Sequence, residues 1–249
     1  MAQTNPTNPA NPANKKSARN PLIDVLITII LPSLILMKLS ADHRLGTVAA
    51  LLLALSLPLL WGGWDLWARR KFNAFALLGL ISVVLTGGIG LLHLDAYWLA
   101  VKEAAIPGLI GLAVLVSSWT RYPLIRVILY NPAVLNVERV QQQLEARGNA
   151  QAFERRLKVA TMLVAGTFFF SSTMNFILAR WIVTSPAGSV AFNEELGHLT
   201  LLSYPVIAIP SMVMMIVTLL WLGRGIRQLS GLGLLELIND SREAKSSGQ

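Results

Sequence analysis

The chain has 249 residues, of which 54% are hydrophobic and only 14% charged, and its mean hydropathy is +0.56. Soluble domains carry about 25% charged residues, so the composition excludes an ordinary soluble domain and indicates an integral membrane protein. The absence of cysteine excludes a disulfide framework, thiolate chemistry and a soft metal site. Basic residues collect on the cytoplasmic side of membrane proteins, which explains the net charge of +8 without nucleic acid as a partner.

The chain order predicts an all-α transmembrane bundle of about six spans, because lipid offers no partner to exposed backbone groups and the apolar runs lack the alternation of a barrel. Residues 1–20 repeat Asn-Pro units and are predicted to be a disordered tail. Membrane spans 1–4 fill residues 21–120, a connecting segment covers 121–158, spans 5 and 6 fill 159–223, and a second tail covers 224–249. The individual spans are predicted at about 21–39, 46–67, 73–92, 96–118, 159–183 and 200–223.

The connecting segment 121–158 is predicted to be an interfacial, amphipathic segment on the cytoplasmic side. Its first part, 121–131, is apolar but too short to cross about 30 Å of hydrocarbon, and the sequence leaves open whether it lies on the bilayer or re-enters it. From Val134 to Arg147, apolar residues recur at helical spacing among Glu, Gln and Arg. This pattern predicts an amphipathic interfacial helix between spans 4 and 5, against the membrane or a partner.

The basic residues predict the orientation in the membrane. With the N-terminus inside, 17 of the 21 Lys and Arg residues fall on the inner side. The sequence therefore predicts a membrane topology with both termini in the cytoplasm. The inner basic residues are expected to attract the anionic lipids of that leaflet. Those expected to contact lipid are Arg69, Arg70, Lys71, Arg155, Arg156 and Lys158.

A pair of adjacent charges, Lys102 and Glu103, interrupts the fourth span. A charge at mid-bilayer costs about 2.5–3.5 kcal/mol on insertion scales, so it needs a partner or a purpose. One interpretation is a polar site for a solute, a proton or a lipid headgroup, with Lys38, Asp95 and Asn175 as further members. The other is a structural ion pair, with Lys102 reaching outward to Asp95.

Other polar features are weaker signals. The run Ser171–Ser172–Thr173 before Asn175 suits helix packing or the wall of a polar cavity. Prolines inside the spans, Pro32, Pro58, Pro107, Pro205 and Pro210, indicate either kinks or the broken helices of transporters.

The three histidines, His43, His93 and His198, fall in predicted outer loops near carboxylates, but none has metal-ligand spacing. Ordinary interface polarity explains them. His198 belongs to a predicted loop, 184–199, that also holds Glu194 and Glu195.

The hairpin formed by spans 3 and 4 resembles the bacterial inner-membrane septation protein A (YciB) family. The matching residues are Gly87-Gly88, Leu91-Leu92, Asp95, Lys102, Ser117, Tyr122 to Arg126, Arg155-Arg156-Leu157 and Asn175. Glu103 stands where the family pattern has proline, and the segments 132–153 and 185–199 are longer, so the chain resembles a distant branch. The resemblance implies a multi-spanning protein of the bacterial inner membrane with a role in septation or envelope maintenance, in a family with no established enzymatic reaction.

Two functions are weighed. The first is a non-enzymatic envelope protein that acts through lipid contacts and through envelope or division proteins, with no cofactor. The second is a transporter of a small solute, proton or lipid that uses the Lys102/Glu103 site. A membrane enzyme is disfavoured, because the predicted cytoplasmic loops contain no histidine and no serine–histidine arrangement. The substrate, the partner and whether the chain forms a homo-oligomer are not set by the sequence.

Overall fold

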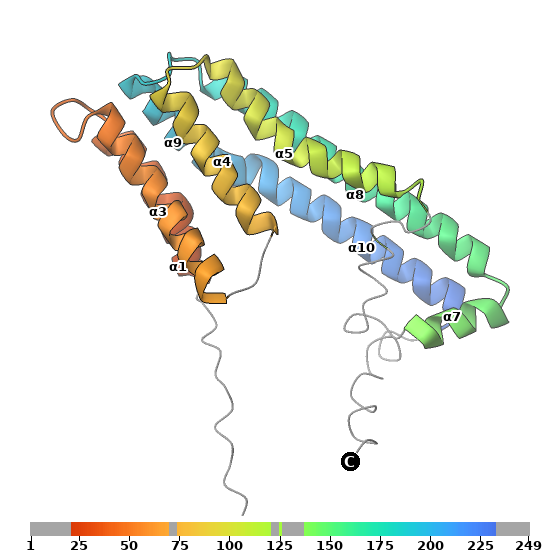
Figure 1. The fold of residues 1–249 in the computed structure, drawn as a ribbon. Helices are drawn as coiled ribbons and strands as arrows, with labels where there is room; N and C mark the ends of the chain where they lie inside the picture. Colours follow the sequence, from red (N-terminus) through yellow and green to blue (C-terminus); the bar gives the residue numbers. More distant parts are fainter. Residues whose placement is uncertain (1–20, 70–73, 121–124, 126–136, 233–249) are drawn as a thin grey trace, which may run out of the picture.

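In the computed structural model, residues 21–69, 74–120, 125 and 137–232 are described, and every regular element among them is a helix (Figure 1). The protein is therefore an all-α bundle, as predicted. The elements are α1 (Pro21–Val25), η1 (Leu26–Ile30), α2 (Leu31–Leu39), α3 (Thr47–Arg69), α4 (Ala74–Leu91), α5 (Ala96–Ser117), α7 (Val137–Ala146), α8 (Ala150–Ile182), α9 (Val190–Ser203), η2 (Tyr204–Ala208) and α10 (Ile209–Ser230).

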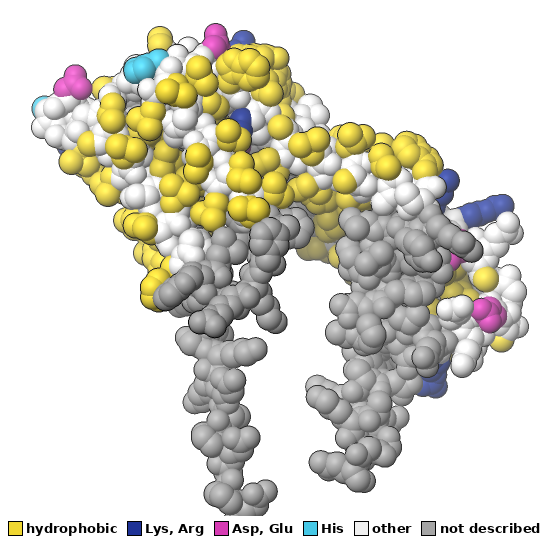
Figure 2. Space-filling model, in the orientation of Figure 1, with side chains coloured by type: hydrophobic (Ala, Val, Ile, Leu, Met, Phe, Trp, Pro, Cys, Tyr) yellow, Lys and Arg dark blue, Asp and Glu magenta, His cyan; other side chains and the backbone are white. Residues whose placement is uncertain are grey.

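Four helices in the described part of the chain are long and apolar enough to cross a membrane. They lie at Thr47–Trp64, Ala96–Ser117, Ala150–Ile182 and Val190–Ser230. A shorter apolar helix, Leu77–Leu91, stands at the predicted third span, and α1, η1 and α2 together cover the predicted first span. Hydrophobic side chains cover the middle of one face, while charged side chains gather towards its two ends (Figure 2). The chain is thus a membrane-embedded helical bundle.

The helices define two ends of the bundle. Residues 40–46, 92–95 and 183–189 meet at one end, here called the hairpin end, where His93 Nδ1 lies 2.8 Å from the carbonyl oxygen of Ala187. The helix α7 lies at the opposite end, the α7 end, beside the far ends of α8 and α10 (Figure 1). Predicted segment 121–131 falls outside the described residues, apart from Ile125.

Two of the predicted proline irregularities take the form of π-helical turns. The turn η1 comes just before Pro32, and η2 contains Pro205. Proline has no N–H and its ring clashes with the carbonyl of the preceding turn, so a widened turn accommodates it without ending the helix. Around Pro58 and Pro107, by contrast, the chain stays α-helical.

The predicted loop 184–199 is wrong for most of its length, because α9 begins at Val190 and carries Glu194, Glu195 and His198 within it. Ser189 caps this helix by accepting the backbone N–H of Phe192 at 3.1 Å. Glu195 has a structural role at the start of this helix. It accepts the backbone N–H groups of Thr184 and Ser185 at 3.0 and 2.9 Å, so it holds the turn that leads into the helix.

The amphipathic helix between spans 4 and 5 is confirmed as α7. Its buried residues Val140 and Leu144 pack into a cluster with Leu157 of α8 and Ile226 of α10. Asn149 follows α7 and donates from Nδ2 to the carbonyl of Leu229 at 2.9 Å. The apolar face of α7 is therefore covered by this chain's own helices.

Candidate functional site

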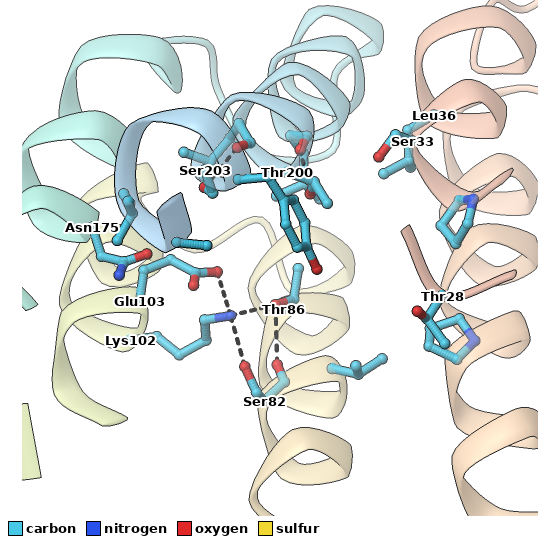
Figure 3. A pocket seen from close by; sticks show the side chains of 18 of the residues that line it. Thr28, Ser33, Leu36, Ser82, Thr86, Lys102, Glu103, Asn175, Thr200 and Ser203 are labelled. Carbon is cyan, nitrogen blue, oxygen red and sulfur yellow. Dashed lines mark hydrogen bonds and ion pairs between the residues drawn. The ribbon is translucent and has the colours of Figure 1, made fainter. Parts of the chain in front are cut away.

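A cavity of about 570 Å³ lies within the bundle (Figure 3). Its walls come from the first helical stretch, from α3, α4 and α5, from α8, and from α9 through α10. Its polar lining residues are Thr28, Ser33, Ser82, Thr86, Lys102, Glu103, Ser171, Asn175, Thr200, Ser203, Tyr204 and Ser211. A volume of this size falls in the range of small-molecule binding sites, about 300–1,000 Å³.

The side chain of Lys102 is nearly buried and all three of its ammonium protons have acceptors. Its Nζ lies 2.6 Å from Oε1 of Glu103, 2.7 Å from Oγ1 of Thr86 and 3.2 Å from Oγ of Ser82 (Figure 3). An ammonium group has three donors, so this set satisfies it completely. The cost of burying the charge is offset by one carboxylate and two hydroxyls.

The hairpin of α4 and α5 brings these groups level. Thr86 lies five residues before the end of α4, and Lys102 lies six residues after the start of α5. Antiparallel helices joined by a short turn place such positions opposite each other. Asp95 fixes the start of α5 because its Oδ1 accepts the backbone N–H of Tyr97 at 2.7 Å. At 1.5 Å per residue, Lys102 then stands about 10 Å beyond Asp95 along the helix.

Glu103 is the more accessible member of the ion pair. Its side chain is 28% exposed, compared with 8% for Lys102, and it lines the cavity. A buried ion pair of this kind adds no net charge to the membrane interior. Removing either partner alone leaves an uncompensated charge, which is far more costly than the pair.

The part of the wall formed by α8, α9 and α10 carries hydroxyl and amide groups. Oγ of Ser171 and Oγ of Ser211 lie 2.7 Å apart and join the two helices. Nδ2 of Asn175 donates to the carbonyl of Ser171 at 2.8 Å. The hydroxyls of Thr200 and Ser203 donate to carbonyls one turn earlier, at 2.9 and 2.7 Å, so their oxygens remain as acceptors. This wall is polar but uncharged.

The neighbouring Ser172 serves packing. Its Oγ donates to the carbonyl of Ala104 at 2.8 Å, across the contact between α8 and α5. Gly108 and Gly111 let these helices approach, since a Cβ on Gly111 would lie 3.0 Å from the Cβ of Phe168. Of the polar run in the fifth span, Ser171 and Asn175 therefore line the cavity, whereas Ser172 holds the helices together.

The structure brings three of the five predicted site residues together. Lys102, Glu103 and Asn175 line the cavity. Lys38 is exposed near the end of α2, and Asp95 is the exposed cap of α5, and neither is among the described lining residues. The alternative pairing of Lys102 with Asp95 is wrong, because the ammonium group contacts the adjacent Glu103 instead.

Sequence reasoning missed the two acceptors on α4. Ser82 and Thr86 are four residues apart, so they lie on one face of a helix that is otherwise apolar. Two hydroxyl residues on one face of a span, at the same depth as a lysine on the next span, could have been predicted to accept hydrogen bonds from that lysine. It also missed Thr200, Ser203 and Tyr204, because the first of these lay next to a predicted loop and the others resembled ordinary residues of the last span.

The basic residues expected to contact lipid have different environments. Arg155 and Lys158 are exposed, whereas the guanidinium of Arg156 lies 4.7 Å from the ring centroid of Trp221 and donates to Oε1 of Gln228 at 3.3 Å. Arg156 is thus bound to α10. The side chains of Arg69, Arg70 and Lys71 lie outside the described part of the chain.

Among the described residues, no group of three or more His, Cys, Asp or Glu side chains is placed to hold a metal ion. Comparison with protein-family models, with curated proteins and with solved structures finds no match.

Proposed function

We propose that this membrane protein transports a small solute, which binds in the cavity beside Lys102 and Glu103. The observation that carries the proposal is that an open volume reaches a buried ion pair inside the bundle. A purely structural ion pair needs no such volume, since packed side chains would serve it as well. Intramembrane ionisable groups that face a cavity are typical of solute and proton pathways.

The two π-helical turns support the same proposal. Thr28 of η1 and Tyr204, Ile207 and Ala208 of η2 line the cavity. Backbone irregularity within a membrane is tolerated where it lines a cavity, and transporters place it at their binding sites. Both turns are therefore positioned to let the first and last helical stretches move around a bound solute.

The proposed location is the bacterial inner membrane, with the α7 end in the cytoplasm. Exposed Arg155, Lys158, Arg224 and Arg227 lie on the segments that reach the α7 end, and cytoplasmic segments are enriched in such residues. With this orientation, the hairpin end faces the outer side of the membrane and the α7 end faces the cytoplasm.

The test uses thiol accessibility, since the chain has no native cysteine. Val83→Cys places a thiol on the cavity wall, and its neighbour Val84→Cys places one on the exposed, lipid-facing side of the same helix. Each variant is made in the full chain and treated in sealed vesicles of either orientation with a membrane-impermeant methanethiosulfonate reagent. We expect Val83→Cys to react from both faces and Val84→Cys from neither.

Reaction of Val83→Cys from a single face would contradict passage through the bundle, and no reaction from either face would contradict an open cavity. A second pair, Ser211→Cys on the cavity wall and the exposed Val213→Cys, repeats the comparison on α10. Because both members of a pair share a helix and a depth, differences in folding or expression do not explain a difference in labelling.

A second proposal is a non-enzymatic protein of septation or envelope maintenance. The resemblance to the septation protein A family supports it, as does α7, whose outer face is polar, with Gln141, Gln142 and Glu145 exposed. The two proposals separate in the double variant Lys102→Ala/Glu103→Ala. Transport predicts loss of flux with normal localisation, whereas a scaffold predicts that division and partner binding are retained without any flux to lose.

A further inference from the structure

We infer that the solute is a monocarboxylate with an apolar body, and that it binds together with one proton. The inference rests on the transport function proposed above and names the substrate class of the same cavity. Lys102 is the anion anchor, and Glu103 is the group that receives the proton. Three observations carry it: the acceptors of Lys102, the unequal exposure of the ion pair and the uncharged remainder of the wall.

Lys102 is built as a fixed anion site. Two of its protons go to Thr86 and Ser82 on α4, which hold the ammonium in place from a neighbouring helix. Only its third proton goes to a carboxylate, that of Glu103 at 2.6 Å. A carboxylate of a ligand offers the same chemical group at the same distance, so it can replace Glu103 without disturbing the contacts to α4.

Glu103 is the partner that can leave. It is more exposed than Lys102 and faces the open volume, and no described contact other than Lys102 holds its side chain. The described titratable groups on the cavity wall are Lys102, Glu103 and Tyr204, so no second cation is there to neutralise a displaced carboxylate. Separated charges in a low-dielectric interior are strongly unfavourable. Glu103 must therefore become neutral when it leaves.

Exchange of the two carboxylates conserves both protons and charge. The ligand carboxylate accepts the third Lys102 proton as a hydrogen bond, and Lys102 stays an ammonium. Glu103 takes up a proton from a hydronium ion or buffer acid of the solvent at the open side of the cavity, or from the ligand when the ligand enters as the neutral acid. Either route adds one anion and one proton, so the charge of the cavity is unchanged. Anion uptake without a proton would leave a net negative charge inside the bundle.

A cationic ligand does not fit this site. To contact Glu103 it must displace Lys102, whose charge would then face only the hydroxyls of Ser82 and Thr86. Apolar side chains such as Leu36, Leu55, Leu199 and Ile207 also line the cavity and suit the body of an amphipathic acid. The combination of one cation, one displaceable carboxylate and an apolar wall selects the monocarboxylate.

The experiment uses the purified full chain in detergent and three matched probes: 4-phenylbutyrate, its amide and its amine. Binding heats at pH 7 are measured in buffers with different enthalpies of ionisation, which gives the number of protons taken up per ligand. We expect 4-phenylbutyrate to bind with uptake of about one proton, and its affinity to fall about tenfold per pH unit of increase. The amine is expected not to bind.

Variants of the ion pair sharpen the test. Glu103→Gln carries a permanently neutral side chain, so it should bind 4-phenylbutyrate without proton uptake and without dependence on pH. Lys102→Gln should lose binding. Glu194→Gln makes the same change on an exposed position of α9 and should behave as the unmodified chain. If Lys102→Gln is not stable in detergent, Glu103→Gln still decides the question, since its amide oxygen accepts from Lys102 and the bound carboxylate supplies the negative charge that the substitution removes.

The failures of the two proposals are distinct. Anion binding without proton uptake, or pH-dependent binding that survives in Glu103→Gln, overturns the coupling. Tighter binding of the amine than of the carboxylate, or no binding of any probe while Val83→Cys remains reactive, overturns the substrate class and leaves the transport proposal standing. An unreactive Val83→Cys overturns the transport proposal itself.

Discussion

The helices α8 and α10 contribute to both the cavity and the core at the α7 end, yet they present different side chains to the two regions. Around the cavity, Ser171 and Ser211 meet across a polar gap, and an ion pair is left beside open space. At the α7 end, Leu157 and Leu222 are almost completely buried and α7 closes the cluster.

The comparison shows that one part of this helix pair is packed for stability and another part is open and polar. The α7 end is packed like the core of a soluble protein. Its apolar side chains contact one another, and Asn149 donates to the carbonyl of Leu229 near the end of α10. The cavity region keeps polar groups that packing does not require. Substitutions at the α7 end should therefore change stability alone, and substitutions of the ion pair at the cavity should change binding as well.

The largest effect is expected for Lys102→Ala. It leaves the carboxylate of Glu103 unpaired inside the bundle, and breaking a buried pair from one side costs about 3–5 kcal/mol. The double variant Lys102→Ala/Glu103→Ala should be more stable than this single variant, because no charge then remains. Thermal unfolding of both proteins in detergent measures the difference. A double variant less stable than Lys102→Ala would show that the pair is not the source of the effect.

At the α7 end, Leu157→Ala should destabilise by about 2–5 kcal/mol, the range for large-to-small substitutions in a packed core. Leu157 is fully buried in the cluster that α7 closes. The matched change Leu163→Ala lies on the exposed side of the same helix and should have little effect. Thiol labelling of Val83→Cys in the Leu157→Ala background should stay unchanged. Altered labelling would join the two regions that the structure separates.

A smaller loss is expected where α9 approaches α2. A Cβ on Gly197 would lie 2.8 Å from the backbone oxygen of Ser33, and backbone cannot move aside as a flexible side chain does. Gly197→Ala should therefore cost about 1–3 kcal/mol through overpacking. Gly223→Ala on α10 is the control, since no atom stands within 4 Å of its added Cβ. Equal unfolding temperatures for the two variants would contradict the close approach.

Removal of Arg156 tests the joint between α8 and α10. Arg156→Ala loses the contact with the Trp221 ring and the hydrogen bond to Gln228, so we expect a loss of about 0.5–2 kcal/mol. Arg155→Ala, next to it and exposed, is the control. Binding of anionic lipid to the protein should fall more for Arg155→Ala than for Arg156→Ala. The opposite order would return Arg156 to the lipid-facing surface.

The smallest expected effect is that of Ser211→Ala. It removes one interhelical hydrogen bond, worth on average about 0.6 kcal/mol between membrane helices. Stability should change little, while the affinity for a carboxylate probe should stay within a few fold, because the anchor is Lys102. A large loss of binding in Ser211→Ala would move the anchor to the other wall.

Much of this architecture is already present in the sequence. The apolar runs, the break around Gly148-Asn149 and the helical spacing of Val140 and Leu144 specify α5, α7 and α8 locally. The two errors share one cause. Each concerned the groups that a polar side chain binds: Glu195 accepts hydrogen bonds from the preceding turn, and Lys102 contacts the adjacent Glu103 and reaches across to α4 instead of binding Asp95.

The sequence by itself determined that this chain is a helical membrane protein and that Lys102 and Glu103 lie within one of its spans, because hydrophobic length and the cost of a charge in lipid are properties of single segments. Only the tertiary structure decided that these charges meet Ser82 and Thr86 and face a cavity closed by the first and last helical stretches. The physical reason is that a cavity is defined by helices far apart in the chain, and their packing is invisible to any local pattern.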